Sequence, residues 1–340
     1  GAPSTPDARE YDLVVANGLL LDHEQISIHE VEIRVSDGSG TLNKIFSITL
    51  TDRANETITG SSGNDTFIAD DSDGNDSLSG AAGNDVLDTG IGNDTLNGGT
   101  GNDAMTGGTG NDSITGGAGD DVINYTFGDG NDPTIDGGAD NDTLNITGSA
   151  ANNTLTVAYN GIALTNFNGG GISSVEVVNA DLLGGIDTLS YGGSAAGVTA
   201  SVATGTASGF ASLAGAENLT GGTGSDNLVG DGGANVLSGG GGTGTDTLNG
   251  AGGNDTLTGG AGADILTGGL GDDTMNGGAD NDIFGEADGI QNDRCLGPAK
   301  ILVRKGHSPC RIERRSCEDG EEANQADGSG CGQAARGQLA

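Results

Sequence analysis

Carboxylate side chains recur at one fixed place in a short repeat, and they are the residues of this chain best suited to chemistry. Between Gly80 and Asn124, five nine-residue units follow without a gap: GAAGNDVLD, TGIGNDTLN, GGTGNDAMT, GGTGNDSIT and GGAGDDVIN. The sixth position is always aspartate and the eighth is always apolar, while glycine dominates the first, second and fourth. The unit returns four times in a row from Gly250 to Gly285. One hydrophobe and one acid per short, fixed period indicate a solenoid.

Each unit is expected to make one sharp turn and one very short strand. Glycine adopts the positive φ angles that such a turn needs, and the apolar eighth side chain points inward from the strand. If two units form one coil, aspartates 18 residues apart lie in one column. Asp85, Asp103 and Asp121 then form one column, and Asp76, Asp94 and Asp112 form the other.

Carboxylates stacked in columns repel one another unless a cation lies between them. Neighbouring parallel strands lie about 4.8 Å apart, and two unit charges about 4 Å apart cost roughly 1 kcal/mol in water and several at lower dielectric. Burying one medium-sized apolar side chain per unit contributes about 1.5–3 kcal/mol, and ordering glycine-rich backbone is costly. Ca²⁺ suits the site because it takes about 6–8 oxygen ligands, and turns supply carbonyls beside the carboxylates. We therefore expect calcium to be a folding partner.

The units resemble the RTX, or hemolysin-type, calcium-binding nonapeptide family, GGxGxDxUx. The resemblance is carried by GGTGNDSIT (107–115), GGAGADILT (259–267) and GGLGDDTMN (268–276), among others. It implies an all-β, right-handed parallel β-roll with calcium between successive turns, in proteins that bacteria export. The alternative is a disordered Gly/Asn/Asp-rich linker, although a linker does not need an apolar residue two places after each aspartate. The position-six residues expected to bind calcium are Asp65, Asp76, Asp85, Asp94, Asp103, Asp112, Asp121, Asp132, Asp142, Asp226, Asp246, Asp255, Asp264, Asp273 and Asp282.

Several units depart from the pattern. Asn235 replaces the position-six aspartate, so we expect that site to bind weakly or to be empty. Asp140 and Asp280 replace the position-four glycine, which predicts a strained turn or an extra carboxylate. Two extra residues within 239–249 are predicted to break the 18-residue column, and Pro133 puts the apolar residue of its unit one place late. These interruptions predict fewer ions than aspartates.

Composition narrows the class of protein. The chain has 340 residues, 68 glycines, no Trp and only 3% aromatic residues, so a conventional packed core is excluded and a quasi-one-dimensional fold is required. A formal net charge of −37 argues against nucleic acid as a partner and disfavours anionic membrane surfaces. No run of 18 apolar residues occurs, which predicts no membrane span. Residues 1–293 lack cysteine, as a secreted bacterial calcium protein would.

The first sixty residues follow a different pattern. HEVEIRVSDG and NKIFSITLTD alternate in hydrophobicity and predict two strands joined by a turn at SDGSG. LDHE (21–24), VSDGSG (35–40) and ITLTD (48–52) resemble the C-terminal half of a cadherin-like domain. The resemblance implies calcium ligands at Glu24, Asp37 and Asp52. The early strands of that domain are missing and its terminal motif reads DRANE, so a loose hairpin with solvated acids is the alternative.

The middle and the end of the chain lose the repeat. LTVAYNGIALTNF predicts a hairpin that turns at Asn160 and Gly161, and a degenerate unit surrounds Asp187, to which we assign no chemistry. From about Arg294 the composition changes abruptly, with four cysteines but no CxxC spacing. The sequence thus predicts five segments: a partial cadherin-like segment (1–54), a first roll block (55–145), a metal-poor β-rich connection (146–216), a second roll block (217–285), and an anomalous tail (286–340) that is disordered or a shifted reading frame.

The sequence offers no catalytic arrangement. His23 and His29 are six residues apart, whereas a zinc protease motif needs two histidines four apart on a helix, and no G-x-S-x-G motif occurs. We therefore expect a non-enzymatic, calcium-dependent structural module of a secreted or cell-surface bacterial protein, disordered in the calcium-poor cytosol and folded outside. One alternative is calcium-dependent adhesion to a cell-surface protein or to itself through the cadherin-like segment. Another is the C-terminal module of an exoenzyme whose catalytic domain is absent here. The tail does not resemble a type I secretion signal.

Overall fold

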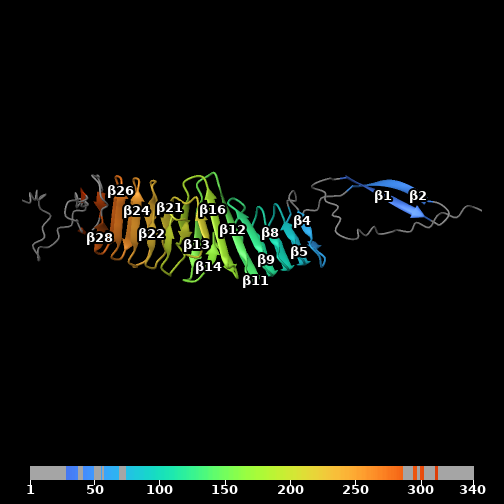
Figure 1. Cartoon of the computed structure of the whole chain (residues 1–340), viewed down its shortest axis with the longest axis horizontal. Coiled ribbons are helices and arrows are strands. Elements are labelled where there is room, and N and C mark those ends of the chain that lie inside the picture. The colour runs from blue at the N-terminus through green and yellow to red at the C-terminus, as the bar shows by residue number, and fades with distance from the viewer. Residues whose placement is uncertain are drawn as a thin grey trace, which may run out of the picture.

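The protein forms a long stack of short strands. The computed structural model describes residues 28–36, 41–49, 55, 57–68, 74–285, 294–296, 299–301 and 311–312. Every regular element within these residues is a strand. From β3 onwards, the strands lie across the long axis and succeed one another along it (Figure 1). The chain is therefore all-β, as its periodicity predicts.

The first two strands form a separate antiparallel pair. β1 (Ile28–Ser36) runs against β2 (Thr41–Thr49), with Ile28 opposite Thr49 and Ser36 opposite Thr41. The hairpin predicted from alternating hydrophobicity is confirmed. The proposed cadherin-like ligands Glu24, Asp37 and Asp52 lie outside the described residues, so their part in calcium binding stays a prediction.

Successive repeat units alternate between two parallel sheets, so two units make one coil. In the register, Leu78 lies opposite Leu96 and Leu96 opposite Ile114 on one side, while Leu87 lies opposite Met105 on the other. These 18-residue offsets confirm the predicted coil. One side contains β3 (Thr57–Thr59), β5 (Ser77–Ala82), β7 (Thr95–Thr100), β9 (Ser113–Ala118) and β11 (Thr134–Ala139). The other contains β4 (Thr66–Ile68), β6 (Val86–Asp88), β8 (Ala104–Thr106), β10 (Val122–Thr126) and β12 (Thr143–Ser149).

The middle segment widens the coils without interrupting the stack. β13 (Thr154–Tyr159) pairs antiparallel with β14 (Leu164–Phe167), which pairs antiparallel with β15 (Gly170–Ser173). The Asn160 N–H donates to the Ala163 carbonyl oxygen, which confirms the predicted turn. The remaining strands of this segment are β16 (Val177–Leu183), β17 (Thr188–Ser190), β18 (Thr199–Ser201), β19 (Thr206–Ala207) and β20 (Ser212–Ala214).

Regular coils resume towards the C-terminal end. β21 (Asn218–Thr220), β22 (Asn227–Val229), β23 (Val236–Ser238), β24 (Thr247–Gly252), β25 (Thr256–Ala261), β26 (Ile265–Leu270), β27 (Thr274–Ala279) and β28 (Asp282–Gly285) build them. Three further strands, β29 (Arg294–Leu296), β30 (Ala299–Ile301) and β31 (Arg311–Ile312), pair parallel onto this end. The parallel pairing therefore extends into the segment that the sequence assigns to an anomalous tail.

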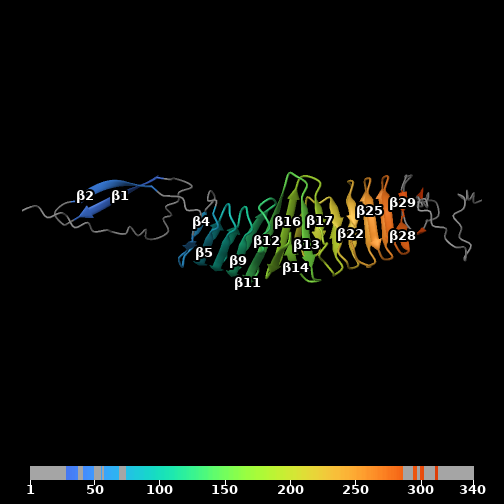
Figure 2. The same cartoon turned by 180° about the vertical axis from the view of Figure 1, so that it is seen from behind.

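One side of the stack is continuous and the other is divided. A 15-stranded sheet runs from β3 to β31 in the order β3-β5-β7-β9-β11-β15-β14-β13-β17-β21-β23-β25-β27-β29-β31. The opposite strands form two seven-stranded sheets, one from β4 to β20 and one from β19 to β30. Seen from behind, β12, β16 and β17 succeed one another where the middle segment joins the two ends (Figure 2).

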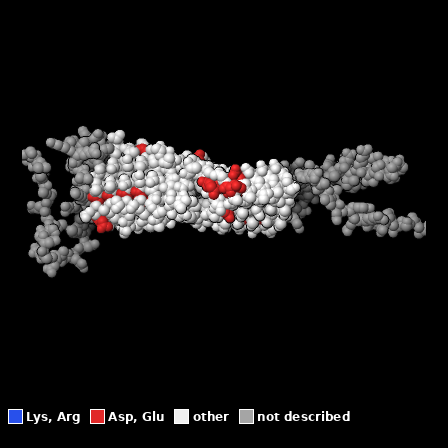
Figure 3. Space-filling model, turned by 60° about the horizontal axis from the view of Figure 1, so that its bottom comes forward, with Lys and Arg blue, Asp and Glu red and all other residues white. Residues whose placement is uncertain are grey.

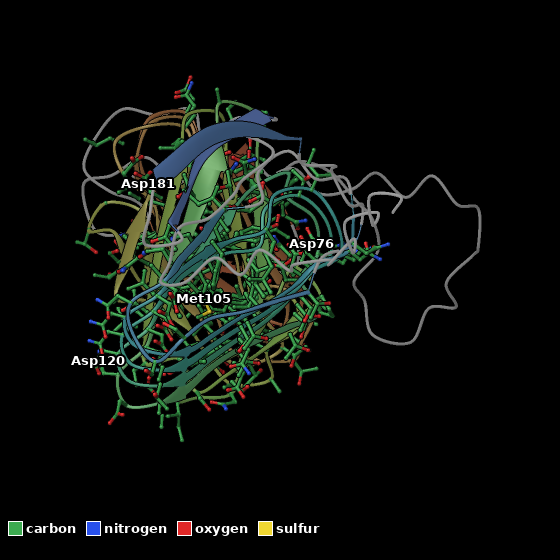
Figure 4. The ribbon with its side chains drawn as sticks, turned by 90° about the vertical axis from the view of Figure 1, so that its right-hand side faces the viewer. Asp76, Met105, Asp120 and Asp181 are labelled. Carbon is green, nitrogen blue, oxygen red and sulfur yellow. The ribbon has the colours of Figure 1, made fainter. Side chains whose placement is uncertain are left out.

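The core lies between the sheets and is built from the position-eight side chains of both, with Ile135 one place later in its unit. Met105 lies inside the cross-section when the stack is viewed along its axis (Figure 4). Each of these residues is at most 1% exposed: Leu78, Leu87, Leu96, Met105, Ile114, Ile123, Ile135, Leu144, Leu219, Leu228, Leu237, Leu248, Leu257, Leu266, Met275 and Phe284. In the wider middle coils, Tyr125 and Phe167 pack edge to face, with ring centroids 4.7 Å apart. Among the described residues, no helix has the length and apolarity needed to cross a membrane.

Removing one core side chain should weaken the whole stack. Leu96 is 1% exposed and is stacked between Leu78 and Ile114, so Leu96→Ala should lower the free energy of unfolding by about 2–5 kcal/mol. Urea unfolding at saturating calcium measures this loss. Thr95→Ala, at the neighbouring exposed position, is the control and should change stability by less than about 0.5 kcal/mol. Equal effects of the two changes would contradict a core made of position-eight side chains.

Candidate metal-binding columns

Most position-six carboxylates accept a backbone hydrogen bond from the coil before them. In one column, the Asp85 N–H donates to Asp103 Oδ1 at 2.7 Å, and the Asp103 N–H donates to Asp121 Oδ1 at 2.8 Å. In the other, the Asp94 N–H donates to Asp112 Oδ1 at 2.8 Å. Asp76 of one column and Asp120, which directly precedes Asp121 of the other column, lie on opposite sides of the cross-section (Figure 4).

The same pattern extends over the rest of the predicted ligands. The Asp246 N–H donates to Asp264 Oδ1 at 2.9 Å, and the Asp255 N–H donates to Asp273 Oδ1 at 2.8 Å. The structure thus places the position-six aspartates of both blocks in columns. The remaining members, joined by the same bond, are Asp65, Asp76, Asp132, Asp142, Asp226 and Asp282.

In many of these carboxylates the second oxygen is buried and has no hydrogen-bond donor, whereas Asp226 Oδ2 accepts the Gly222 N–H. A buried carboxylate oxygen without a partner is costly, because it has lost its water and gained nothing in return. The described residues with a buried, unpartnered Oδ2 include Asp85, Asp94, Asp103, Asp112, Asp121, Asp142, Asp187, Asp255, Asp264 and Asp282. The regular recurrence of this atom indicates a recurring ligand instead of an isolated packing fault.

Backbone carbonyls face these oxygens because the turns are made of glycine. A methyl group at Gly80 would lie 2.6 Å from the carbonyl oxygen of Gly98 in the next coil and would overlap Asp85 Oδ2. Gly98 has the same relation to the carbonyl oxygen of Gly116 and to Asp103 Oδ2. Only a residue without Cβ fits here, and the space that it leaves is bordered by oxygens from two coils.

The donor set fits a hard divalent cation. Among the described residues, no three acidic, histidine or cysteine side chains converge on one point. Any bound ion would therefore combine carboxylate oxygens with turn carbonyls, which is the ligand chemistry that Ca²⁺ accepts. On one face the acidic side chains lie in a compact group and in a line along the axis, and no basic side chain is coloured among the described residues of that face (Figure 3).

Burial raises the pKa of several column aspartates. It raises the pKa of Asp112 to about 7, with neighbouring carboxylates adding to the rise. Burial also raises the pKa of Asp121, Asp132, Asp246 and Asp255 to about 6. The backbone N–H that each carboxylate accepts acts in the opposite direction but does not cancel the burial. Keeping these carboxylates charged in the folded chain therefore costs free energy.

The columns tolerate interruptions that the sequence predicts would break them. The Asn235 N–H still donates to Asp255 Oδ1 at 2.8 Å across a 20-residue step. The predicted break at residues 239–249 is therefore wrong, because the extra residues lie in the turn and leave the strands in register. Pro133 is tolerated in the same way, since Ile135 is fully buried opposite Ile114.

Substituted turns keep the backbone shape that glycine favours. Asp140 has φ +87° and Asp280 has φ +75°, both in the left-handed region, which confirms the predicted strain at position four. Ala81 and Ala251 hold position two at φ +74° and +73°. The stack therefore imposes the turn even where the local residue disfavours it.

Three features of the site escaped the sequence analysis. Position five carries a second ladder on the outside, in which the Asn102 N–H donates to Asn84 Oδ1 at 3.0 Å. Glu176 takes the place of a column aspartate by accepting the Asp142 N–H, and Glu217 does so for the Asp187 N–H. The sequence signal for both glutamates is an apolar residue two places later. The repeat has the same spacing between its aspartate and its apolar residue, although most of the consensus glycines are missing here.

Comparisons with known proteins agree with the geometry. A family model described as RTX calcium-binding nonapeptide repeat (4 copies) matches residues 51–73, 70–105, 97–132, 213–246, 240–275 and 249–284. A search of curated proteins finds no significant match. The matched residues leave out the N-terminal hairpin and the middle segment, so the cadherin-like resemblance has no support from these comparisons.

Acid should partly replace calcium as a stabiliser of the columns. The pKa of Asp112 rises from 3.8 to about 7 in the folded chain, so the folded state binds protons more tightly than the unfolded state. Its stability is then greatest at low pH and is lost as the pH rises through about 6–7. In chelator, the β-sheet signal in circular dichroism should therefore grow as the pH falls from about 8 to 5. Asp112→Asn should flatten this dependence, and an unchanged slope would contradict it.

We expect the side-chain amide of Asn235 to occupy the place that a cation takes beside a position-six aspartate. Its Nδ2 donates to the Glu217 carbonyl oxygen at 2.7 Å, and its Oδ1 accepts the Asp231 N–H at 2.8 Å. Asn235→Asp removes that donor and adds a buried charge, so folding should require more calcium while one more ion is bound at saturation. Native mass spectrometry and a calcium titration measure the two effects. Asn254→Asp, at an exposed position-five residue, is the control and should leave the ion number unchanged.

Proposed function

Because residues 51–132 and 213–284 belong to the RTX calcium-binding nonapeptide repeat family, we propose that calcium ions bound between the coils complete the fold of this roll. The observation that carries the proposal is the buried, unpartnered Oδ2 at one coil after another. The ligands are the carboxylates of both columns together with glycine carbonyls of the adjacent turns. The chain is then a structural module whose folded state depends on calcium.

The stretch of sequence that carries the columns supplies no basic side chain as a counter-ion. Residues 54–293 contain no Lys, Arg or His, so no basic side chain of this stretch is available to pair with a buried carboxylate. The free energy of calcium binding instead offsets the repulsion and the cost of burial. A metal ion that binds the folded and not the unfolded chain makes folding follow the calcium concentration.

The proposed location is outside the cell, at the surface of a bacterium or in its surroundings. Calcium is scarce in the cytosol and plentiful outside, so a chain of this kind would stay unfolded during export and fold afterwards. The module has a structural role and no catalytic one in this proposal, which is supported by a buried acid set that faces turn carbonyls instead of an open cleft. Two other hypotheses rest on the sequence alone: adhesion through the N-terminal segment, and attachment to an exoenzyme.

Calcium dependence can be tested directly on the full chain. Circular dichroism should show the β-sheet signal appearing cooperatively as calcium is added to chelated protein, since each ion joins two coils. Asp103→Asn and Asp264→Asn should each reduce the number of ions counted by native mass spectrometry. Asp120→Asn changes an exposed acid whose Oδ1 accepts the Asn141 N–H, and it should have no such effect. A chelated chain with the full β-sheet signal at neutral pH would sink the proposal.

A further inference from the structure

We propose that Asp187, in the middle segment that the repeat pattern leaves without metal, completes a further calcium site together with the turn of the coil before it. The proposal rests on the calcium-binding role of the columns and extends it to residues that the family model does not match. The two turns concerned are residues 149–153 and 183–187, which are 34 residues apart along the chain and adjacent in the stack.

Asp187 has a buried carboxylate oxygen without a hydrogen-bond partner, as many of the repeat aspartates do. Its side chain is fully buried, and its Oδ2 has no hydrogen-bond partner. Its Oδ1 accepts the Asn153 N–H, as Asp103 Oδ1 in the repeat accepts the Asp85 N–H of the coil before it. On the other side, the Asp187 N–H donates to Glu217 Oε2 at 2.7 Å, which brings a second carboxylate to the next turn.

The backbone around Asp187 repeats the shape of the consensus turn. A methyl group at Gly185 would lie 2.7 Å from the Ala151 carbonyl oxygen and 3.1 Å from Asp187 Oδ1, so both oxygens border one small space. In the repeat, Gly92 has the same relation to the Gly74 carbonyl oxygen and to an aspartate Oδ1. The position-four carbonyl of one coil thus faces the carboxylate of the next in both places.

Two further features of the turn match the repeat although its residues do not. Leu183 occupies position two with φ +64°, beside the +74° of Ala81 in the first block. A bulky residue in this region is strained, so the turn is imposed by its neighbours. The Ile186 N–H donates to Asn152 Oδ1 at 3.0 Å, which continues the position-five ladder.

The chemistry of the space selects a hard cation. It is bordered by carboxylate and carbonyl oxygens, and residues 54–293 supply no basic side chain that could enter it. Asn153 stands where the repeat has a second aspartate, so this site has one carboxylate fewer on its near side and should bind more weakly than a consensus site. Carboxylate and carbonyl oxygens at a turn are the ligands of Ca²⁺.

Counting ions on the full chain tests the site. Native mass spectrometry at saturating calcium should find one ion fewer in Asp187→Asn than in the unchanged protein. Asp181→Asn is the matched control, because Asp181 is an exposed acid of the same coil and its Oδ1 contact with the Leu183 N–H is kept by asparagine. An equal ion number in Asp187→Asn and the unchanged protein would overturn the inference while leaving the columns of the repeat intact.

A second variant decides the matter if Asp187→Asn does not fold at saturating calcium. Asn153→Asp restores the consensus pair and keeps the Oδ1 that accepts the Ser149 N–H. It should retain one ion more than the unchanged protein when free calcium is lowered until weak sites empty, and an equal or smaller number would overturn the site. Failure of the unchanged protein to bind any calcium would instead overturn the proposed function as a whole.

Discussion

The hydrogen bond from one backbone amide to the carboxylate of the next coil is the contact on which the structure depends. It fixes the spacing of the coils, because one carboxylate oxygen must meet an N–H of its neighbour. In many coils it also leaves the other carboxylate oxygen buried and without a donor. Order in the backbone is thus coupled to an electrostatic cost that repeats with every coil. In the proposed function, a divalent ion would remove that cost without disturbing the bond that creates it.

This coupling explains why the columns survive such irregular spacing. Successive position-six residues are 18 residues apart in the regular coils, but 20 at Asn235 and Asp255, 21 at Asp121 and Asp142, and 34 at Asn153 and Asp187. Extra residues are accommodated in the turns or in the β13–β15 hairpins, whereas the strand positions stay in register. Nearest-neighbour contact between coils is sufficient for this, since a solenoid needs no contacts between distant parts.

The repeat predicted most of the fold because its constraints are local. Leu96 and Asp103 could be placed on the inside and in a column from period alone, since each coil sees nearly the same neighbours. Glu176, Glu217 and Asp187 could not be placed in this way, because their coils keep only part of the repeat pattern and are 30 to 34 residues long. The tolerance of the insertion at 239–249 was missed for a related reason. The repeat period predicts the length of a coil. Strand pairing determines how many extra residues can be inserted in a turn without changing the register.

The strands lie across the long axis, so a force applied along that axis acts on the hydrogen bonds between coils one after another. Hydrogen bonds that are loaded one after another break one at a time. A force along the strands would instead load many hydrogen bonds in parallel. Tension on the ends of this roll would therefore peel terminal coils away while the inner ones stayed closed. Each peeled coil would release its ions, and local calcium would set how readily it closed again.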